Sequence, residues 1–396
     1  MRIVNRKLCE VKRILTVATL VMSLYVIIIN FSTYEKNFQE GINSRIEETG
    51  DKKDINYLHN FNSRDDDSWG AKHPILKTDK SATLQNMIIS TWRSGSTFVG
   101  EAVASHPETY YHFEPLNQFR IVQARSGEPF AQEATQLVKN LMKCDYSSLQ
   151  EYIEFGVEHV YPHNHNPKVW VHCERQRHLC ADWEFLSKTC NSVSIQLMKA
   201  VRFRLSLAES LLSDDALNLR VLFLVRDPRG SLLSRRNLTW CQKSPDCFDT
   251  SRVCADMVAD FKAGAKLRDK YPGQIKFIRY EDLMMNVEPE IKSILRFFRL
   301  DYHPDIQNFI ASHTVTRVGN DFSTFRDSKT MPFHWIDHYL QDNNDSHVLQ
   351  NIETQCQEAM NLWGYEPLPF TRIGESTIAV PLLPPPWPEM KIASDD

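Results

Sequence analysis

Several common signatures are missing from this chain of 396 residues. No G-x-x-x-x-G-K-[ST] sequence occurs, which excludes a Walker A phosphate loop. No C-x2-C pair occurs among the nine cysteines, which disfavours a zinc knuckle. The formal net charge is -4, so no global basic field recruits nucleic acid or polyanions. Any anionic ligand must therefore be held by local clusters of cationic side chains.

The chain has one long hydrophobic run, the 18 uncharged residues at 14–31. That length is just sufficient to span a bilayer, and five basic residues precede it against one acid. Because positive charge stays cytoplasmic, we expect a signal anchor with residues 1–13 in the cytoplasm. A cleaved signal peptide is the alternative, although the run lacks a small-residue cleavage site. The polar residues 32–83 are expected to form a lumenal stem.

Cysteine usage is consistent with a lumenal domain. Cys9 lies on the expected cytoplasmic side, and the other eight form an even set that favours disulfides in an oxidising compartment. Their connectivity cannot be deduced from the sequence. Glycosylation acceptor sequences at Asn237 and Asn344 also suit a lumenal domain. The eight cysteines are Cys144, Cys173, Cys180, Cys190, Cys241, Cys247, Cys254 and Cys356.

The alternation of apolar segments and helical patterns predicts an α/β fold. The candidate strands are 86–90, 109–113, 194–198, 221–225 and 275–279. Helical patterns between them favour a parallel central sheet flanked by helices. The length and 42% hydrophobic content are sufficient for one large α/β domain or two smaller ones, and we place one domain at 84–369. The proline-rich residues 370–396 are expected to be irregular.

The segment 91–98 follows the first predicted strand and opens a helical pattern. A strand, a turn of small residues and a helix N-terminus form an anion site, because backbone N–H groups and the helix dipole favour negative charge. The hydroxyl groups of its serines and threonine can donate further hydrogen bonds. We expect a nucleotide phosphate here, and a purely structural turn is the alternative.

A second informative segment is 220–235, where an apolar strand leads directly into Arg226. Ligands bind at this end of the strands in open α/β sheets. Pro228 suits the first turn of a new helix, which would carry Ser234. Arg226 and Ser234 could therefore converge on one phosphate. The alternative is a surface ion-pair cluster of Arg226, Asp227 and Arg229.

Together the two segments resemble the Golgi carbohydrate sulfotransferases, specifically the galactose/N-acetylglucosamine/N-acetylgalactosamine 6-O-sulfotransferase group. An R-S-G-[ST]-[ST]-F loop is present at 93–98, and R-D-P-R-x-x-x-x-S-R is present at 226–235. The segments 113–115, 199–202 and 323–329 are also similar to the family. The resemblance extends over most of residues 86–366. It implies a P-loop-like nucleotide-binding sulfotransferase fold in a single-pass type II Golgi membrane protein.

The resemblance implies transfer of a sulfuryl group from 3'-phosphoadenylyl sulfate to a sugar 6-hydroxyl. The first loop would hold the 5'-phosphosulfate of the donor, and Arg226 with Ser234 would bind its 3'-phosphate. No metal is required by this chemistry. The residues implied for donor binding are Arg93, Ser94, Gly95, Ser96, Thr97, Phe98, Arg226 and Ser234.

For catalysis, Arg93 and Lys199 would supply positive charge and Glu114 would act as the base that accepts the hydroxyl proton. Two alternatives remain at this point. Glu114 could instead orient Arg93 or Lys199, or His112 could be the base, since strand alternation predicts that it shares a face with Glu114. The Lys-Thr-His of cytosolic sulfotransferases is replaced here by Lys-Ala-Val at 199–201.

The expected partner is a glycan or proteoglycan acceptor. Arg202 and Arg326, with Lys199, could contact acidic or sulfated glycans. Trp92 and Trp335 could stack on a sugar ring, although core packing is the favoured role for both. The sequence leaves open which sugar is sulfated and whether the chain forms a homodimer. Other candidate functions are a lumenal P-loop-type kinase or nucleotide hydrolase, and an inactive glycan-binding relative.

Overall fold

The computed structural model describes residues 83–315, 324–325, 331–341, 343–368 and 382–387. Within these ranges, no helix combines the length and apolar character needed to cross a membrane. The predicted anchor, the predicted stem and most of the proline-rich tail lie outside the described residues.

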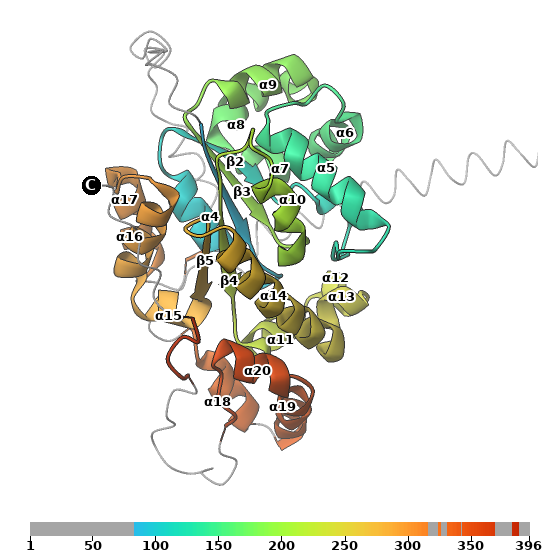
Figure 1. Ribbon diagram of the computed structural model, residues 1–396, viewed down its shortest axis with the longest axis vertical. Helices are drawn as coiled ribbons and strands as arrows, with labels where there is room; N and C mark the ends of the chain where they lie inside the picture. The colour runs from blue at the N-terminus through green and yellow to red at the C-terminus, as the bar shows by residue number, and fades with distance from the viewer. Residues whose placement is uncertain (1–82, 316–323, 326–330, 342, 369–381, 388–396) are drawn as a thin grey trace, which may run out of the picture. The chain divides into compact units, whose positions relative to one another are not determined.

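Five parallel strands form one sheet in the order β2-β3-β1-β4-β5 (Figure 1). They are β1 (Leu84–Ile89), β2 (Thr109–Phe113), β3 (Ile195–Ala200), β4 (Leu219–Val225) and β5 (Ile275–Arg279). All five predicted strands are confirmed, with ends within two residues of the predicted ones. β1 is the central strand, with β3 and β2 on one side and β4 and β5 on the other. In open α/β sheets, ligands bind at the carboxyl end of the strand from which the chain runs to both sides, so the expected ligand site is the carboxyl end of β1.

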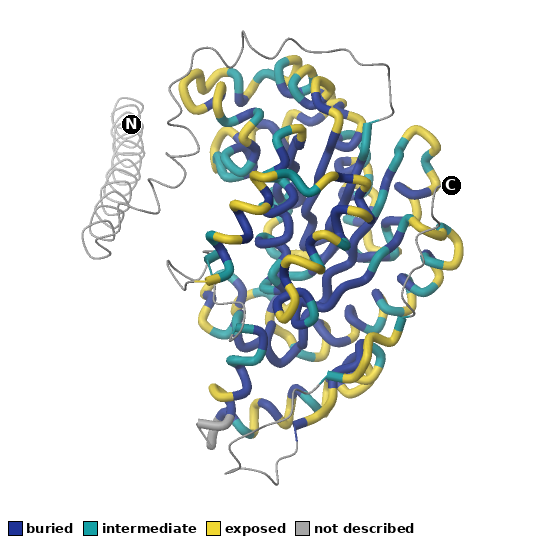
Figure 2. Tube along the Cα trace, turned by 90° about the vertical axis from the view of Figure 1, so that its left-hand side faces the viewer, coloured by how far each residue is buried: buried dark blue, intermediate teal, exposed yellow. Residues whose placement is uncertain are grey.

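One face of the sheet packs against a group of helices around Ile88, Leu197 and Leu222. These helices are α4 (Ser96–Ala104), α15 (Tyr280–Met285), α16 (Val287–Phe298) and α17 (Pro304–His313). The strands are buried on both faces, which explains why they are nearly continuous apolar runs. Figure 2 shows these buried residues along the strands and the exposed residues on the outer sides of the helices.

The opposite face packs against a larger set of helices around Met87, Met198 and Val221. This set comprises α5 (Phe130–Met142), α6 (Gln150–His159), α8 (Pro167–Cys173), α9 (Trp183–Asn191), α10 (Glu209–Leu212), α11 (Pro228–Arg236), α14 (Thr250–Lys270), α18 (His334–Gln341), α19 (Asn343–Gln355) and α20 (Gln357–Trp363). Shorter elements are η1 (Asn117–Phe119), α7 (Tyr161–Asn164), η2 (Arg177–Ala181), η3 (Leu205–Ala208), α12 (Thr239–Gln242) and α13 (Pro245–Phe248). The predicted helix start at Pro228 is confirmed.

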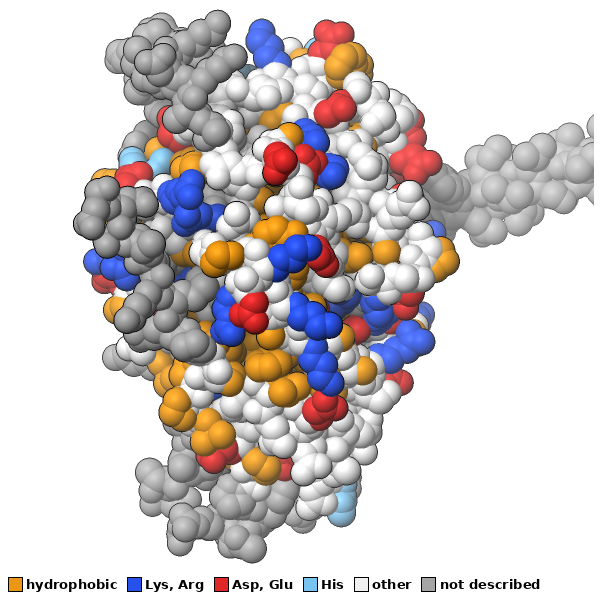
Figure 3. Space-filling model, viewed as in Figure 1, with side chains coloured by type: hydrophobic (Ala, Val, Ile, Leu, Met, Phe, Trp, Pro, Cys, Tyr) orange, Lys and Arg blue, Asp and Glu red, His pale blue; other side chains and the backbone are white. Residues whose placement is uncertain are grey.

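The surface drawn in Figure 3 carries basic and acidic side chains interspersed with one another. This arrangement agrees with the formal net charge of -4. Specific binding of an anion must therefore depend on cations placed locally at the edge of the sheet.

All eight cysteines that the sequence marks as a disulfide set are paired. The pairs are Cys144–Cys190, Cys173–Cys180, Cys241–Cys247 and Cys254–Cys356. Two of the bonds close segments of 7 and 6 residues and a third spans 46, whereas the fourth joins α14 to the end of α19 across 102 residues. The C-terminal helices are thus covalently tied to the sheet-covering helix α14.

Replacing Cys254 and Cys356 together by Ser is expected to destabilise the protein more than replacing Cys241 and Cys247. The closed segments span 102 and 6 residues, respectively. Loop-closure entropy then predicts losses of about 4.7 and about 2 kcal/mol in the free energy of unfolding. Urea unfolding of the two double variants would measure the difference, and equal losses would contradict the entropic argument.

Candidate active site

The loop between β1 and α4, where the sequence predicts an anion site, lies at the carboxyl end of the central strand. Arg93 and Gly95 adopt left-handed backbone conformations, with φ of 62° and 84°. Gly95 caps α4 without a side-chain hydrogen bond, and the first turn of the helix contains no acidic residue. The Ser94 hydroxyl is buried and has no hydrogen-bond partner among the described residues. The predicted loop therefore has donors available for an anionic group.

Gly95→Ala is expected to damage this loop beyond the cost of its backbone conformation. A Cβ at position 95 would lie 2.4 Å from Cδ2 of Tyr280, whereas a Cβ at Gly127, with φ of 86°, would meet nothing within 4 Å. Gly127→Ala should cost about 1–2 kcal/mol of stability, as the left-handed conformation alone predicts. Gly95→Ala should cost more and also weaken binding of 3',5'-ADP, the product of the expected donor. Thermal unfolding and calorimetry would test this, and identical behaviour of the two variants would contradict it.

The two predicted donor segments meet in space. Arg93 Nε donates a hydrogen bond to Ser234 Oγ at 3.0 Å, and Arg226 Nη1 donates to the Arg93 carbonyl at 2.8 Å. The Arg226 guanidinium lies 4.5 Å from the centroid of the Tyr280 ring, and its buried Nε has no hydrogen-bond partner among the described residues. The loop after β1 thus contacts both the end of β4 and the last turns of α11, which brings Arg93, Arg226 and Ser234 together.

The alternative of a surface ion-pair cluster in this segment is wrong. Asp227 and Arg229 do pair, with Nη2 and Oδ2 2.8 Å apart, but both are buried. Arg229 also pairs with Glu353 on α19 at 2.6 Å. Arg226 takes no part, because it leaves the strand toward the loop after β1.

Arg235 is a further member of the site that the sequence quoted only as part of a motif. It is fully buried and holds the loop through hydrogen bonds to the Trp92 carbonyl at 2.7 and 3.1 Å. Burial, together with repulsion by Arg204, Arg226 and Arg93, lowers the pKa of Arg235 to about 9. Neither Arg226 nor Arg235 forms an ion pair with a described carboxylate. An excess of positive charge is thus concentrated where the sequence predicts a phosphate.

A second cluster lies at the ends of β2 and β3. Lys199 Nζ contacts Glu114 Oε1 at 2.6 Å and donates to Thr97 Oγ1 on α4 at 3.1 Å. Arg202 Nη1 contacts the other oxygen of Glu114, Oε2, at 2.7 Å. Burial disfavours the charged carboxylate, but Lys199 and Arg202 outweigh it and lower the pKa of Glu114 to about 2. The carboxylate is therefore ionised, and it fixes two cations beside the loop.

The expectation that His112 shares a face with Glu114 is wrong. His112 pairs in register with Met198, and its ring lies 4.9 Å from that of Tyr110 in the core on the opposite side of the sheet. Burial lowers the pKa of His112 to about 3. The alternation of sides ends at Glu114, whose φ of 44° turns its side chain toward Lys199. Side chains alternate only while the backbone stays extended.

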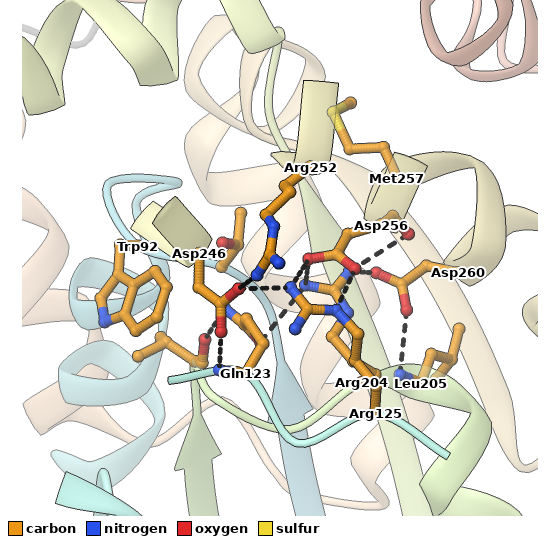
Figure 4. A network of polar contacts seen from close by, with 12 residues as sticks. Trp92, Gln123, Arg125, Arg204, Leu205, Asp246, Arg252, Asp256, Met257 and Asp260 are labelled. Atoms are coloured by element: carbon orange, nitrogen blue, oxygen red, sulfur yellow. Dashed lines mark hydrogen bonds and ion pairs between the residues drawn. The ribbon is translucent and has the colours of Figure 1, made fainter. Parts of the chain in front are cut away.

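An ionic network, buried except for Arg252 and part of Arg125, lies beside the carboxyl end of β3 (Figure 4). Asp246 accepts hydrogen bonds from the Gln123 backbone N–H at 2.8 Å and from Arg125 Nη2 at 2.9 Å. Gln123 Nε2 in turn donates to the Val201 carbonyl at 3.0 Å, next to Arg202. The network also contains Arg204, Arg252, Asp256 and Asp260. It fixes the backbone from which Arg202 reaches the carboxylate.

The two tryptophans are packing residues. Trp92 is 5% exposed and packs with Val201 and Leu238, and Trp335 is fully buried with the Arg229 guanidinium 4.5 Å from its ring centroid. Core packing, the favoured role, is thus confirmed for both. Arg326 lies outside the described residues. Within the described part of the chain, no group of three His, Cys, Asp or Glu side chains could hold a metal ion.

Comparisons with known proteins identify similar chains. Carbohydrate sulfotransferase 6 of Homo sapiens is 26% identical over 355 residues, covering 79% of this chain and 88% of that protein. Carbohydrate sulfotransferase 1 of Danio rerio is 26% identical over 352 residues, covering 74% and 81%. A solved structure of retinol dehydratase in a complex with retinol and PAP has a TM-score of 0.39 and 16% identity, covering 71% of this chain and 82% of that chain. A sulfotransferase domain model matches residues 85–346, and the chain therefore belongs to the sulfotransferase domain family.

Proposed function

We propose that this sulfotransferase transfers a sulfuryl group from 3'-phosphoadenylyl sulfate to the 6-hydroxyl of a galactose, N-acetylglucosamine or N-acetylgalactosamine residue in a glycan or proteoglycan. The observation that carries the proposal is the contact between Arg93 and Ser234, which joins the two donor segments in one site beside Arg226. The curated relatives named above are carbohydrate sulfotransferases, which supports a sugar acceptor.

The unsatisfied donors of the site suit the proposed nucleotide. Ser94 Oγ and Arg226 Nε are buried donors without a partner among the described residues, and such groups are costly unless a ligand completes them. The loop at 93–98 would hold the 5'-phosphosulfate at the N-terminus of α4. Arg226 and Ser234 would hold the 3'-phosphate, a group that ATP and GTP lack.

The proposed reaction is an in-line displacement at sulfur. The acceptor oxygen forms a bond to sulfur while the bond from sulfur to the 5'-phosphate oxygen breaks, which yields a sulfate ester, 3',5'-ADP and one proton. Because charge builds on the leaving phosphate, Arg93, Lys199 and the N-terminus of α4 would stabilise the transition state electrostatically. Holding donor and acceptor in line supplies much of the remaining acceleration.

In this proposal Glu114 takes the proton of the 6-hydroxyl. Its ionised state suits a base, whereas two ion pairs occupy its oxygens and reduce its basicity. Hydrogen bonds in a site without substrate often rearrange when the substrate binds, so this geometry is compatible with the role. The alternative is that Glu114 only orients Lys199 and Arg202.

We further propose that residues 14–31 anchor the protein in the Golgi membrane as a single-pass type II protein with a lumenal catalytic domain. Four disulfides in the described residues support an oxidising compartment. Asn237, in one acceptor sequence for glycosylation, is exposed at the end of α11. Protease protection of a C-terminal tag in sealed Golgi vesicles would test the orientation.

Retention of the full chain on immobilised 3',5'-ADP, followed by transfer of radiolabelled sulfate from the donor to a glycan panel, tests the proposal. We expect retention that free ATP does not reverse and label on the sugar 6-position without added magnesium. ATP hydrolysis or phosphoryl transfer that requires magnesium would instead indicate a kinase or nucleotide hydrolase. Glycan binding without transfer would indicate an inactive relative.

A further inference from the structure

A fully buried carboxyl group, that of Glu281, lies against the peptide that joins Arg226 to Asp227. Glu281 is in the first turn of α15, directly after β5. One of its oxygens, Oε1, accepts a hydrogen bond from the Asp227 backbone N–H at 3.1 Å. Glu281 therefore holds the backbone at the point where Arg226 follows the end of β4, although it belongs to neither of the two predicted donor segments.

The other oxygen of Glu281 is held from the C-terminal part of the chain. The Tyr365 hydroxyl, which is also buried, donates to Glu281 Oε2 at 3.0 Å. The turn before Tyr365 is fixed to the sheet. At the end of β5, Arg279 donates to the carbonyls of Trp363 and Gly364 at 3.3 and 3.0 Å. Tyr365 lies beyond the residues that the sulfotransferase domain model matches, so this support of the site comes from outside the matched region.

Three parts of the chain place charged and titratable groups around Glu281. Arg226 and Asp227 come from the end of β4 and the start of α11, and Tyr365 comes from the turn after α20. Arg279, at the end of β5, lies beside Tyr365, with its guanidinium 5.8 Å from the ring centroid. Of these groups, Arg226 is the one proposed to bind the 3'-phosphate.

The charge of Glu281 is not fixed by an ion pair. Asp227 pairs with Arg229, with Oδ2 and Nη2 2.8 Å apart, whereas Glu281 forms no ion pair with another described residue. Burial, together with repulsion by Asp227, raises the pKa of Glu281 to about 7, although Arg226 opposes this shift. The carboxyl group is therefore partly protonated at neutral pH, and a new charge beside it changes its protonation.

Binding of the donor would place such a charge next to Arg226, the cation that favours the ionised form of Glu281. A doubly charged 3'-phosphate there repels the carboxylate, so the protonated form becomes favoured. The Tyr365 hydroxyl can accept as well as donate a hydrogen bond, so it can serve as a partner for both forms.

We propose that Glu281 is a positioning residue for the 3'-phosphate of the donor, which fixes the peptide after Arg226 and takes up one proton from solvent when the phosphate binds. The inference rests on the proposed function and adds a proton to its donor-binding step. Because binding consumes a proton, the affinity for 3',5'-ADP falls as pH rises through the range in which Glu281 ionises.

The test is calorimetric titration of the full-length protein with 3',5'-ADP between pH 7 and 8.5, where the phosphates are already ionised. The Kd of the wild type should rise about three- to tenfold across this range, because the proton on Glu281 is held more tightly in the complex. Glu281→Gln, a neutral mimic of the protonated carboxyl, should have a nearly constant Kd and bind more tightly than the wild type at pH 8.5. Titrations in two buffers of different ionisation enthalpy should show proton uptake by the wild type and less by Glu281→Gln.

Tyr365→Phe keeps the carboxyl group and removes only the hydroxyl that donates to it. Because a hydrogen bond to a carboxylate favours the ionised form, its loss should move the fall in affinity to higher pH. The matched control is Tyr339→Phe, since the Tyr339 hydroxyl is equally buried but donates to the Arg229 carbonyl on α11, at 3.4 Å. This control should keep the wild-type pH dependence. With 5'-AMP, which lacks the 3'-phosphate, every protein should show little pH dependence.

A wild-type Kd that is constant from pH 7 to 8.5, or an equal rise in Glu281→Gln, would overturn the proposal. The wild-type series and Tyr365→Phe decide the outcome if Glu281→Gln does not fold. If 3',5'-ADP binds with the expected pH dependence but no acceptor receives sulfate, the proposed reaction fails and the role of Glu281 stands. If sulfate is transferred while Glu281→Gln matches the wild type at every pH, the reaction stands and the role of Glu281 fails.

Discussion

Glu114→Gln is expected to lower kcat by about 10²–10⁴-fold, the usual contribution of a general base, with little change in the Kd for 3',5'-ADP. The reason is the position of Glu114, whose carboxylate contacts Lys199 and Arg202 and none of the residues proposed to hold the 3'-phosphate. Single-turnover sulfuryl transfer and calorimetry with 3',5'-ADP measure the two quantities. A variant that keeps most of its turnover would rule out Glu114 as the base.

Comparison with Arg202→Met separates a base from an orienting carboxylate. If Glu114 only positions Arg202, each single variant and the double variant should lose similar amounts of turnover, because all three remove the same ion pair between Glu114 and Arg202. If Glu114 is the base, Glu114→Gln should lose more than Arg202→Met. Glu209→Gln is the matched control, because Glu209 pairs with Lys270 on the exposed surface at the same 2.6 Å. This variant should leave turnover unchanged.

The same residue links folding stability to pH. Because the folded pKa of Glu114 is lowered from 4.5 to about 2, its carboxylate contributes stability that is fully present above pH 4.5. This contribution is lost as pH falls through about 2. The difference in unfolding free energy between wild type and Glu114→Gln should therefore be constant from pH 5 to 7 and shrink below pH 4.5. Denaturant unfolding at a series of pH values measures it.

Arg226→Ala should weaken binding of 3',5'-ADP by about 30-fold to 10³-fold, because truncating one member of a buried charge pair costs ~2–4 kcal/mol. The buried Nε of Arg226 has no hydrogen-bond partner among the described residues, whereas Nη1 donates to the Arg93 carbonyl. Affinity for 5'-AMP, which lacks the 3'-phosphate, should change much less. Calorimetry with both nucleotides gives the loss that is specific to the 3'-phosphate.

Arg236→Ala provides the control for this experiment. Arg236 lies on the same helix α11, is partly exposed and pairs with Asp345, so its removal should leave both nucleotide affinities unchanged. Equal losses of 3',5'-ADP and 5'-AMP in Arg226→Ala would contradict a 3'-phosphate contact. That result would mean that Arg226 acts by supporting the loop through the Arg93 carbonyl.

The sequence predicted the secondary structure around the candidate site. The apolar run before Ser90 and the small residues after it identified β1, the loop and α4, because helix and strand patterns depend on neighbours a few residues apart. Pro228 at the start of α11 follows from the same local rule. These elements place Arg93 and Arg226 at strand ends without any knowledge of the sheet order.

Other features of the site required the assembled sheet. The contact of Arg93 with Ser234 joins residues 141 positions apart, and it exists because β4 lies beside β1. The sequence offers Arg235 only as the last residue of the motif at 226–235, and its burial against the Trp92 carbonyl gives it a structural role.

By itself, the sequence determined the α/β class, the five strands, the loop between β1 and α4 and the set of eight paired cysteines. The tertiary structure alone decided which cysteines pair and that Glu114 faces Lys199 rather than His112. The physical reason is the distance along the sequence between the residues that determine each feature. Helices and strands are determined by residues within a few positions of one another. The pairing of the cysteines depends on the strand order, and the direction of the Glu114 side chain depends on the positive φ of that residue.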